Sequence, residues 1–97
     1  MEIKKNLEGS TLTLELSGRL DTTTSPALEA EISNLADISK LILDFAGLEY
    51  ISSAGLRVLL TAQKSIHSHG EMIIRNVCES IAEVFEITGF SSILTIE

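Results

Sequence analysis

Several residue types are scarce in this sequence, and each scarcity narrows the class of protein. Of the 97 residues one is a cysteine, Cys78, so no internal disulfide can form and no cysteine pair suggests a metal site. No apolar run approaches the roughly 20 residues of a membrane-spanning helix. The segment "MEIKKNLEGS" has no apolar stretch behind its lysines, unlike a secretory signal. We therefore expect one domain over residues 1–97 in the reducing cytoplasm, without direct insertion into a membrane.

Basic residues are also few. Seven lysines and arginines against fourteen aspartates and glutamates give a formal net charge of −7. Proteins that bind a phosphate backbone usually carry the opposite charge, so we expect no nucleic-acid partner. The acidity serves solubility, or it suits a partner with a basic surface.

Motifs for catalysis and cofactor binding are missing as well. Neither the G-x-S-x-G spacing of nucleophilic serines nor a glycine-rich phosphate cradle occurs. His67 and His69 are predicted to lie nearly four turns along the same helix as Ser53. At about 1.5 Å per residue this places them more than about 20 Å from Ser53, too far to activate its hydroxyl. The sequence therefore predicts no catalytic residue, no metal ligand and no cofactor, and it favours a protein that is not an enzyme.

The apolar pattern begins with a period of two. Residues 3–7 and then Leu12, Leu14 and Leu16 alternate with their neighbours on either side of "EGS", which predicts a hairpin with one buried face. From Leu28 the spacing changes to i, i+4, i+7. This predicts a helix that is capped by Ser25, has Pro26 at its first position and runs to about residue 36.

Short strands and helices alternate in the rest of the chain. The run "KLILDF" is typical of a central strand covered on both faces, and "EMIIRN" and "ILTI" predict two more strands. Between them we expect a helix that Gly70 ends in left-handed conformation, and another with a capping box of Asn76 and Glu79 that ends at Gly89. The pattern predicts an α/β fold: an N-terminal hairpin, then alternating helices and strands, in a mixed sheet of four to five strands packed with helices.

The stretch "YISSAGLRVLL" falls at the carboxyl end of the central strand, where such sheets place functional loops. Ser52 is predicted to cap the second helix, whereas Ser53 is its first residue and offers its hydroxyl to solvent beside Arg57. A helix N-terminus favours a phosphoryl group. Ala54 and Gly55 leave this end open to another protein's backbone. The alternative is that both serines only cap the helix and the small residues only allow tight packing.

Two stretches, "LILDFAGLEYISSAGLRVLL" and "GRLDTTTSPALEAEI", resemble the STAS domain, a family named for sulphate transporters and anti-sigma factor antagonists. The resemblance spans essentially the whole chain, in length and element order as well as in motif, and implies a STAS-like fold. Alignment on Gly55 and Leu56 places the family's phosphorylated serine at Ser53. Asp21 matches the family's aspartate in the neighbouring loop, where it contributes to the surface around the acceptor.

The resemblance implies a bacterial anti-sigma factor antagonist that works by partner switching. Its unphosphorylated form binds an anti-sigma factor that is also a serine kinase, and so releases a sigma factor for transcription. Phosphorylation of Ser53 by that kinase ends the complex, and a serine phosphatase restores it. The expected partner-binding residues are Asp21, Thr22, Thr23, Ser52, Ser53, Ala54, Gly55 and Arg57.

The sequence departs from the family's pattern at one position. Many phosphorylated members have an aspartate immediately before the acceptor serine, and Ser52 stands there in this chain. Ser52 is therefore an alternative acceptor. Two other functions stay open: a STAS regulatory subunit of a membrane transporter or lipid-transport ATPase that is not phosphorylated, and a STAS module that binds a small ligand or a nucleotide.

Overall fold

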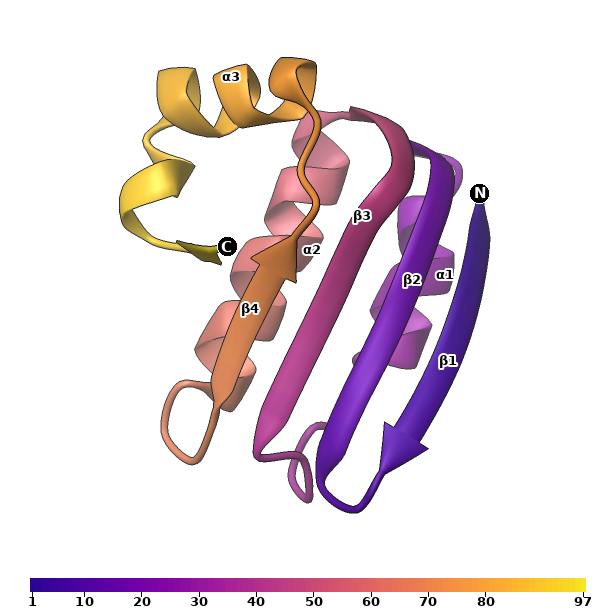
Figure 1. Ribbon diagram of the computed structural model, residues 1–97, viewed down its shortest axis with the longest axis vertical. Helices are drawn as coiled ribbons and strands as arrows, with labels where there is room; N and C mark the ends of the chain where they lie inside the picture. Colours follow the sequence, from indigo (N-terminus) through magenta and orange to yellow (C-terminus); the bar gives the residue numbers. More distant parts are fainter.

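The computed structural model describes residues 1–97 (Figure 1). Strands alternate with helices after an N-terminal hairpin, in the predicted order. The elements are β1 (Glu2–Glu8), β2 (Thr11–Leu20), α1 (Ser25–Glu31), β3 (Lys40–Ile51), α2 (Ser53–Ile66), β4 (Glu71–Arg75), α3 (Glu79–Thr88), a 3-10 helix η1 (Phe90–Ser92) and β5 (Thr95–Ile96). None of the helices has the length and apolarity needed to cross a membrane.

The five strands form one mixed sheet in the order β1-β2-β3-β4-β5. β1 is antiparallel to β2, with Leu7 opposite Leu12, and Gly9 supplies the positive φ of the turn between them. β2, β3, β4 and β5 are parallel neighbours. The predicted α/β fold with a mixed sheet is therefore confirmed, and the carboxyl ends of β2, β3 and β4 meet at one end of the molecule (Figure 1).

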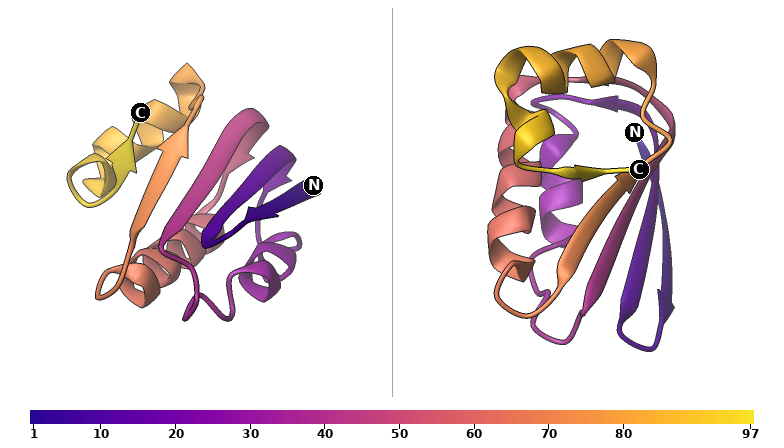
Figure 2. Two further views of the ribbon diagram at one scale, coloured as in Figure 1. Left: turned by 60° about the horizontal axis from the view of Figure 1, so that its bottom comes forward. Right: turned by 60° about the vertical axis from the view of Figure 1, so that its left-hand side comes forward.

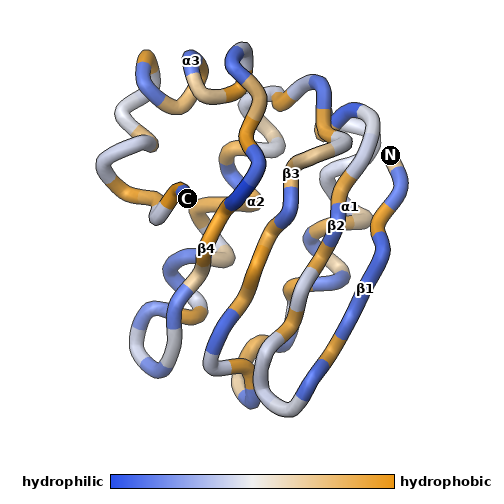
Figure 3. The backbone as a smooth tube through the Cα atoms, in the orientation of Figure 1, coloured by the Kyte–Doolittle hydropathy of each residue, from blue (hydrophilic) through white to orange (hydrophobic).

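Helices α1 and α2 lie against one face of the sheet, and α3 lies across its end (Figures 1 and 2). The inward-facing leucines of β2 and β3 are buried here, and Phe45 meets Phe85 of α3 with ring centroids 6.4 Å apart. Figure 3 shows the apolar residues as an almost continuous run on β3 and as an alternation on β2. The core therefore lies between the sheet and the three helices.

The central strand is buried on both faces, as predicted, although helices cover only one of them. Ile42 points to the face without helices, yet it is only 8% exposed. It lies between Thr13 of β2 and Ile73 of β4, which is also buried. Cross-strand neighbours bury Ile42, so an unbroken apolar run arises without a second helical layer.

Helix α1 is shorter than predicted and starts differently. It ends at Glu31 and not near residue 36, and beyond its end the Ser33 hydroxyl donates to the Ala30 carbonyl over 2.9 Å. Its N-cap is Thr24, not Ser25. The hydroxyl of Ser25 is buried and donates to the Asp21 carbonyl over 2.6 Å, which fixes the loop before the helix.

The start of α3 and the end of α2 also differ from the prediction. Asn76 does not cap α3: it has a φ of 59° and its amide donates to the Asp44 carboxylate over 3.0 Å, while Cys78 is the N-cap. Gly70 is not left-handed, and a side chain there would collide with the Ser39 carbonyl. Gly89 does end α3 in left-handed conformation, with a φ of 82°.

Candidate functional site

The strand that leads to the second helix is longer than predicted. β3 continues to Ile51, past Phe45, where the predicted strand "KLILDF" ends. It can continue because β2 follows it: Leu20 pairs with Ile51 after two irregularities in the register. Both strands therefore end side by side, immediately before the start of α2.

Ser52 joins three elements at this point. Its backbone N–H donates to the Leu20 carbonyl over 2.9 Å, and its carbonyl accepts from the N–H of Leu56 over 3.0 Å. Its hydroxyl oxygen accepts from the N–H of Gly55 over 3.4 Å. With an extended backbone, Ser52 is the N-cap of α2, as predicted, and its side chain is engaged in the cap.

Ser53 is the first residue of α2 and is exposed. Its place at the helix N-terminus puts its hydroxyl in the positive end of the helix dipole, among N–H groups without helical partners. Arg57, one turn further along, is exposed as well. An exposed hydroxyl at a helix N-terminus, with an exposed arginine one turn along, is an arrangement that can accommodate a phosphoryl group.

Gly55 is buried and acts through packing. A Cβ atom there would lie 2.8 Å from both Ile51 Cγ1 and Leu20 Cγ. The absence of a side chain lets the first turn of α2 approach the ends of β2 and β3 closely. Ala54, beside it, is partly exposed.

The loop after β2 is held together by the carboxylate of Asp21. Its Oδ1 accepts from the hydroxyl and the N–H of Thr23 over 2.8 and 3.0 Å, and from the N–H of Thr24 over 3.1 Å. The hydrogen bond from the Thr23 hydroxyl is the main reason why the pKa of Asp21 is lowered. Thr22 and Thr23 themselves are exposed.

A second charged group stands next to this loop. The guanidinium carbon of Arg19 lies 4.1 Å from the centre of the Tyr50 ring, and Arg19 Nε lies 3.8 Å from Asp21 Oδ2. The pair follows from the register, because Arg19 of β2 is directly opposite Tyr50 of β3. Sequence reasoning missed both residues, since it ended β3 at Phe45. The signal was "GRLD", which puts an arginine two residues before the loop aspartate.

These groups form one surface at the carboxyl ends of β2 and β3, which we call the β2–α2 surface (residues 19–24 and 50–57). The hydrogen bond from Ser52 to Leu20 links its two segments. Cys78, at the start of α3, lies at the same end of the sheet, with its Sγ 3.7 Å from the Leu48 carbonyl. The Ser80 hydroxyl beside it lowers the pKa of the thiol.

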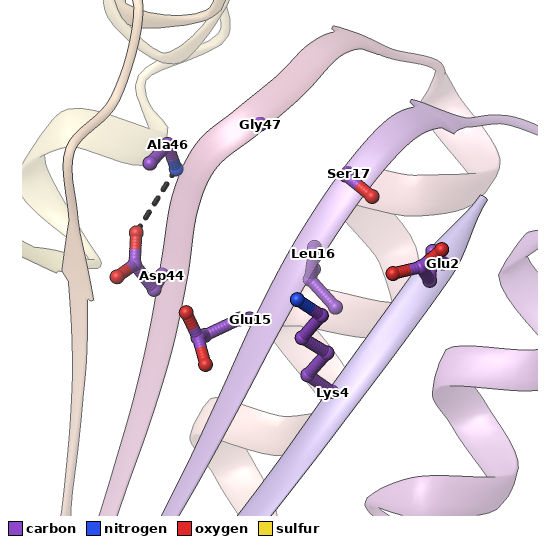
Figure 4. Close-up of a pocket in the computed structure, with 8 residues that line it drawn as sticks. All are labelled: Glu2, Lys4, Glu15, Leu16, Ser17, Asp44, Ala46 and Gly47. Carbon is purple, nitrogen blue, oxygen red and sulfur yellow. Dashed lines mark hydrogen bonds between the residues drawn. The ribbon is translucent and has the colours of Figure 1, made fainter.

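A separate depression opens on the sheet face without helices (Figure 4). It has a volume of about 140 Å³ and forms where the register of β2 and β3 shifts, with Gly47 against Ser17. Its lining is mostly polar: Glu2, Lys4, Glu15, Leu16, Ser17, Asp44, Ala46 and Gly47. None of the expected site residues lies there.

The two histidines are at the far end of α2 from Ser53. His67 is the C-cap residue of the helix. His69 follows in the turn, and its Nε2 lies 2.8 Å from the Leu35 carbonyl. Neither side chain is part of the β2–α2 surface.

Comparison with known proteins gives a family and a fold. The STAS domain family matches residues 2–97. A candidate anti-sigma factor antagonist of Bordetella bronchiseptica, BtrV, is 38% identical over 84 residues, which cover 84% of this chain and 72% of that protein.

Two solved structures of SpoIIAA, described as an anti-sigma factor antagonist and as a Bacillus cell fate determinant, have the same fold. The unphosphorylated form is 20% identical, with a TM-score of 0.79 over 99% of this chain and 87% of that one. The phosphorylated form is also 20% identical, with a TM-score of 0.78 over 99% of this chain and 91% of that one.

Proposed function

The chain belongs to the STAS domain family, and on that premise we propose that it is an anti-sigma factor antagonist switched by phosphorylation of Ser53. In its unphosphorylated state it binds an anti-sigma factor with serine kinase activity through the β2–α2 surface and so frees a sigma factor. The kinase then phosphorylates Ser53, the complex separates, and a serine phosphatase resets the protein. The chain is a binding protein and a kinase substrate in this scheme.

One observation carries the choice of acceptor: Ser53 is exposed at the start of α2, whereas the Ser52 hydroxyl is engaged in the helix cap. A kinase needs a hydroxyl that can reach the γ-phosphate of ATP in line. Ser53 meets this condition without any change in α2. Phosphorylation of Ser52 would require the first turn of the helix to give up its cap. This favours Ser53 over the alternative acceptor.

The expected effect of the phosphate is local. It adds about −1.5 to −2 charges at a helix N-terminus, which accommodates negative charge. The backbone therefore has no reason to rearrange, and the partner is repelled by charge and bulk at one point of its interface. The similar match of this chain to both forms of SpoIIAA supports a switch that keeps the fold.

The residue before Ser53 is Ser52, whereas many phosphorylated members of the family have an aspartate at this position. Ser and Asp are both good N-cap residues, so the substitution keeps the helix start while it removes a charge beside Ser53. We propose that this change affects which kinase recognises the chain and leaves the switch itself in place.

The test uses the anti-sigma factors encoded in the same genome, each purified and titrated against this protein by calorimetry. At least one should bind the wild type and Ser53→Ala, and Ser53→Asp should weaken binding about tenfold or more. With ATP and Mg²⁺, mass spectrometry should locate a single phosphate on Ser53, and Ser52→Ala should still accept it.

Equal binding of wild type and Ser53→Asp would contradict the switch and favour a constitutive adaptor, such as a subunit that regulates a transporter. A phosphate found on Ser52 in the wild type would show that Ser52, and not Ser53, is the phosphorylated residue. If none of the anti-sigma factors binds, the proposed function is wrong.

A further inference from the structure

We propose that Arg19, stacked on Tyr50, is a preoriented cationic anchor of the docking surface and takes a carboxylate side chain of the anti-sigma factor. This inference rests on the proposed function, because it names the chemistry that the partner must present to the β2–α2 surface. It concerns two residues that are not among the partner-binding residues expected from the sequence.

The position of Arg19 is determined from two sides. Its guanidinium carbon lies over the Tyr50 ring, 4.1 Å from the ring centre, and its Nε lies 3.8 Å from Asp21 Oδ2. No hydrogen bond within the protein uses its terminal nitrogens, and 59% of its side chain is exposed. Arg19 therefore presents the outer edge of its guanidinium, with free N–H donors, to whatever approaches the end of the sheet.

A carboxylate fits this edge best. The planar fork of an arginine matches the two oxygens of a carboxylate in a bidentate pair. Because Arg19 already rests on Tyr50, it loses little conformational freedom when such a pair forms. Arginine and tyrosine are also the residue types that most often dominate the binding energy of protein interfaces.

The neighbouring Asp21 does not occupy the outer edge of the Arg19 guanidinium. Its Oδ1 is used by the N–H and hydroxyl groups of Thr23 and Thr24, and its Oδ2 faces Arg19. Asp21 is thus a positioning residue: it closes the loop and orients Arg19. The hydrogen bond from the Ser52 N–H to the Leu20 carbonyl joins the residue after Arg19 to the start of α2, so Arg19 and Ser53 lie at the same end of the sheet.

The charge of the whole chain makes this anchor a source of specificity. At −7 the protein attracts basic surfaces in general. A cation at the docking end adds a requirement that such surfaces do not meet unless they carry an acidic residue opposite Arg19. A basic surface without such a residue would place like charges opposite Arg19, which disfavours binding.

The experiment measures the Kd of the cognate purified anti-sigma factor for four variants that keep Ser53. Arg19→Glu should weaken binding about 30-fold or more, as expected for truncation or reversal of a charge pair at an interface. Arg19→Lys, which keeps the charge and loses the fork, and Tyr50→Leu, which removes the ring, should each weaken it about tenfold. Lys64→Glu, with the same charge change on an exposed face far along α2, should change it about twofold at most.

A compensating change identifies the partner group: one acidic residue of the anti-sigma factor, changed to arginine, should restore binding to Arg19→Glu. Circular dichroism checks that each variant is folded, and Arg19→Gln replaces Arg19→Glu should the latter not fold. If Arg19→Glu binds as Lys64→Glu does while Ser53→Asp still abolishes binding, the anchor is wrong and the proposed function stands. If the wild type binds no anti-sigma factor, the proposed function fails and the assigned partner with it.

Discussion

The hydroxyl of Thr23 donates to the carboxylate of Asp21 over 2.8 Å, and the N–H of the same threonine donates to the same oxygen over 3.0 Å. Two donors from one residue favour the ionised form of the carboxyl group. The loop after β2 is therefore built around a negative charge, although Asp21 stands at the surface of an acidic protein.

This arrangement predicts a lowered pKa that depends on Thr23. In the folded protein Asp21 should titrate below its ordinary value of 3.8, chiefly because of the Thr23 hydroxyl. The ionised Asp21 carboxylate therefore stabilises the folded protein. This contribution is complete above the pKa that Asp21 has in the unfolded chain, and it is lost as the pH falls through the lower pKa of the folded state. Thr23→Val should raise the pKa of Asp21, measured by carbon-13 NMR of its carboxyl group.

The exposed Thr22 provides a matched control. Its hydroxyl makes no hydrogen bond to Asp21, so Thr22→Val should leave the titration of Asp21 unchanged. An ordinary pKa for Asp21 in the wild type would show that the loop is open in solution.

The two adjacent serines should differ in their contribution to stability. Ser52→Ala removes the acceptor for the Gly55 N–H and should cost about 1 kcal/mol, or about 4–8 °C in Tm for a chain of this size. Ser53→Ala removes an exposed hydroxyl and should change the stability by less than about 0.5 kcal/mol. Chemical denaturation of both variants measures the difference; equal losses would mean that the cap is shared.

The element order was predictable because it depends on local patterns. The period of two in residues 3–7 and 12–16 predicts a hairpin with one buried face. The hairpin forms and the leucines of β2 are buried, but β1 is the edge strand and stays largely exposed, Leu7 included. Ser52 was recognised as a cap for the same reason, since capping involves residues within one turn. Such features need no knowledge of the rest of the chain.

The wrong predictions concern residues whose conformation is determined by contacts with residues far away in the sequence. Asn76 has the sequence signature of a cap, but its amide is used by Asp44, 32 residues away. Gly70 sits after a helix, but the Ser39 carbonyl and not a left-handed backbone requires the glycine. The Arg19 and Tyr50 pair likewise depends on the register between two strands, which no local pattern contains.

Gly55 should be intolerant of any side chain. Gly55→Ala places a Cβ atom 2.8 Å from Leu20 and Ile51, and overpacking of this kind costs about 1–3 kcal/mol. The first turn of α2 must move away from the strand ends, so binding of the anti-sigma factor should weaken as well. Urea denaturation and calorimetry together measure the two effects.

Gly89→Ala is the control for that variant. A Cβ atom at Gly89 meets no neighbour, but the φ of 82° makes alanine unfavourable by about 1–2 kcal/mol. Gly89 ends α3, outside the β2–α2 surface. This variant should lose comparable stability and keep its affinity. If both variants lose affinity equally, the loss at Gly55 reflects stability and not the position of α2.

A negative charge at Ser53 should stabilise α2 without changing the fold. Ser53→Asp and Ser53→Asn differ only in charge, and the aspartate should be more stable by about 0.3–1 kcal/mol at low salt, because it interacts with the helix N-terminus. The difference should shrink in 1 M NaCl, where the Debye length is about 3 Å. Backbone amide shifts should change near residues 52–57 only. Shifts that spread into β4 or α3 would mean that charge at Ser53 acts by rearranging the domain, and the partner would then be released through a change of shape.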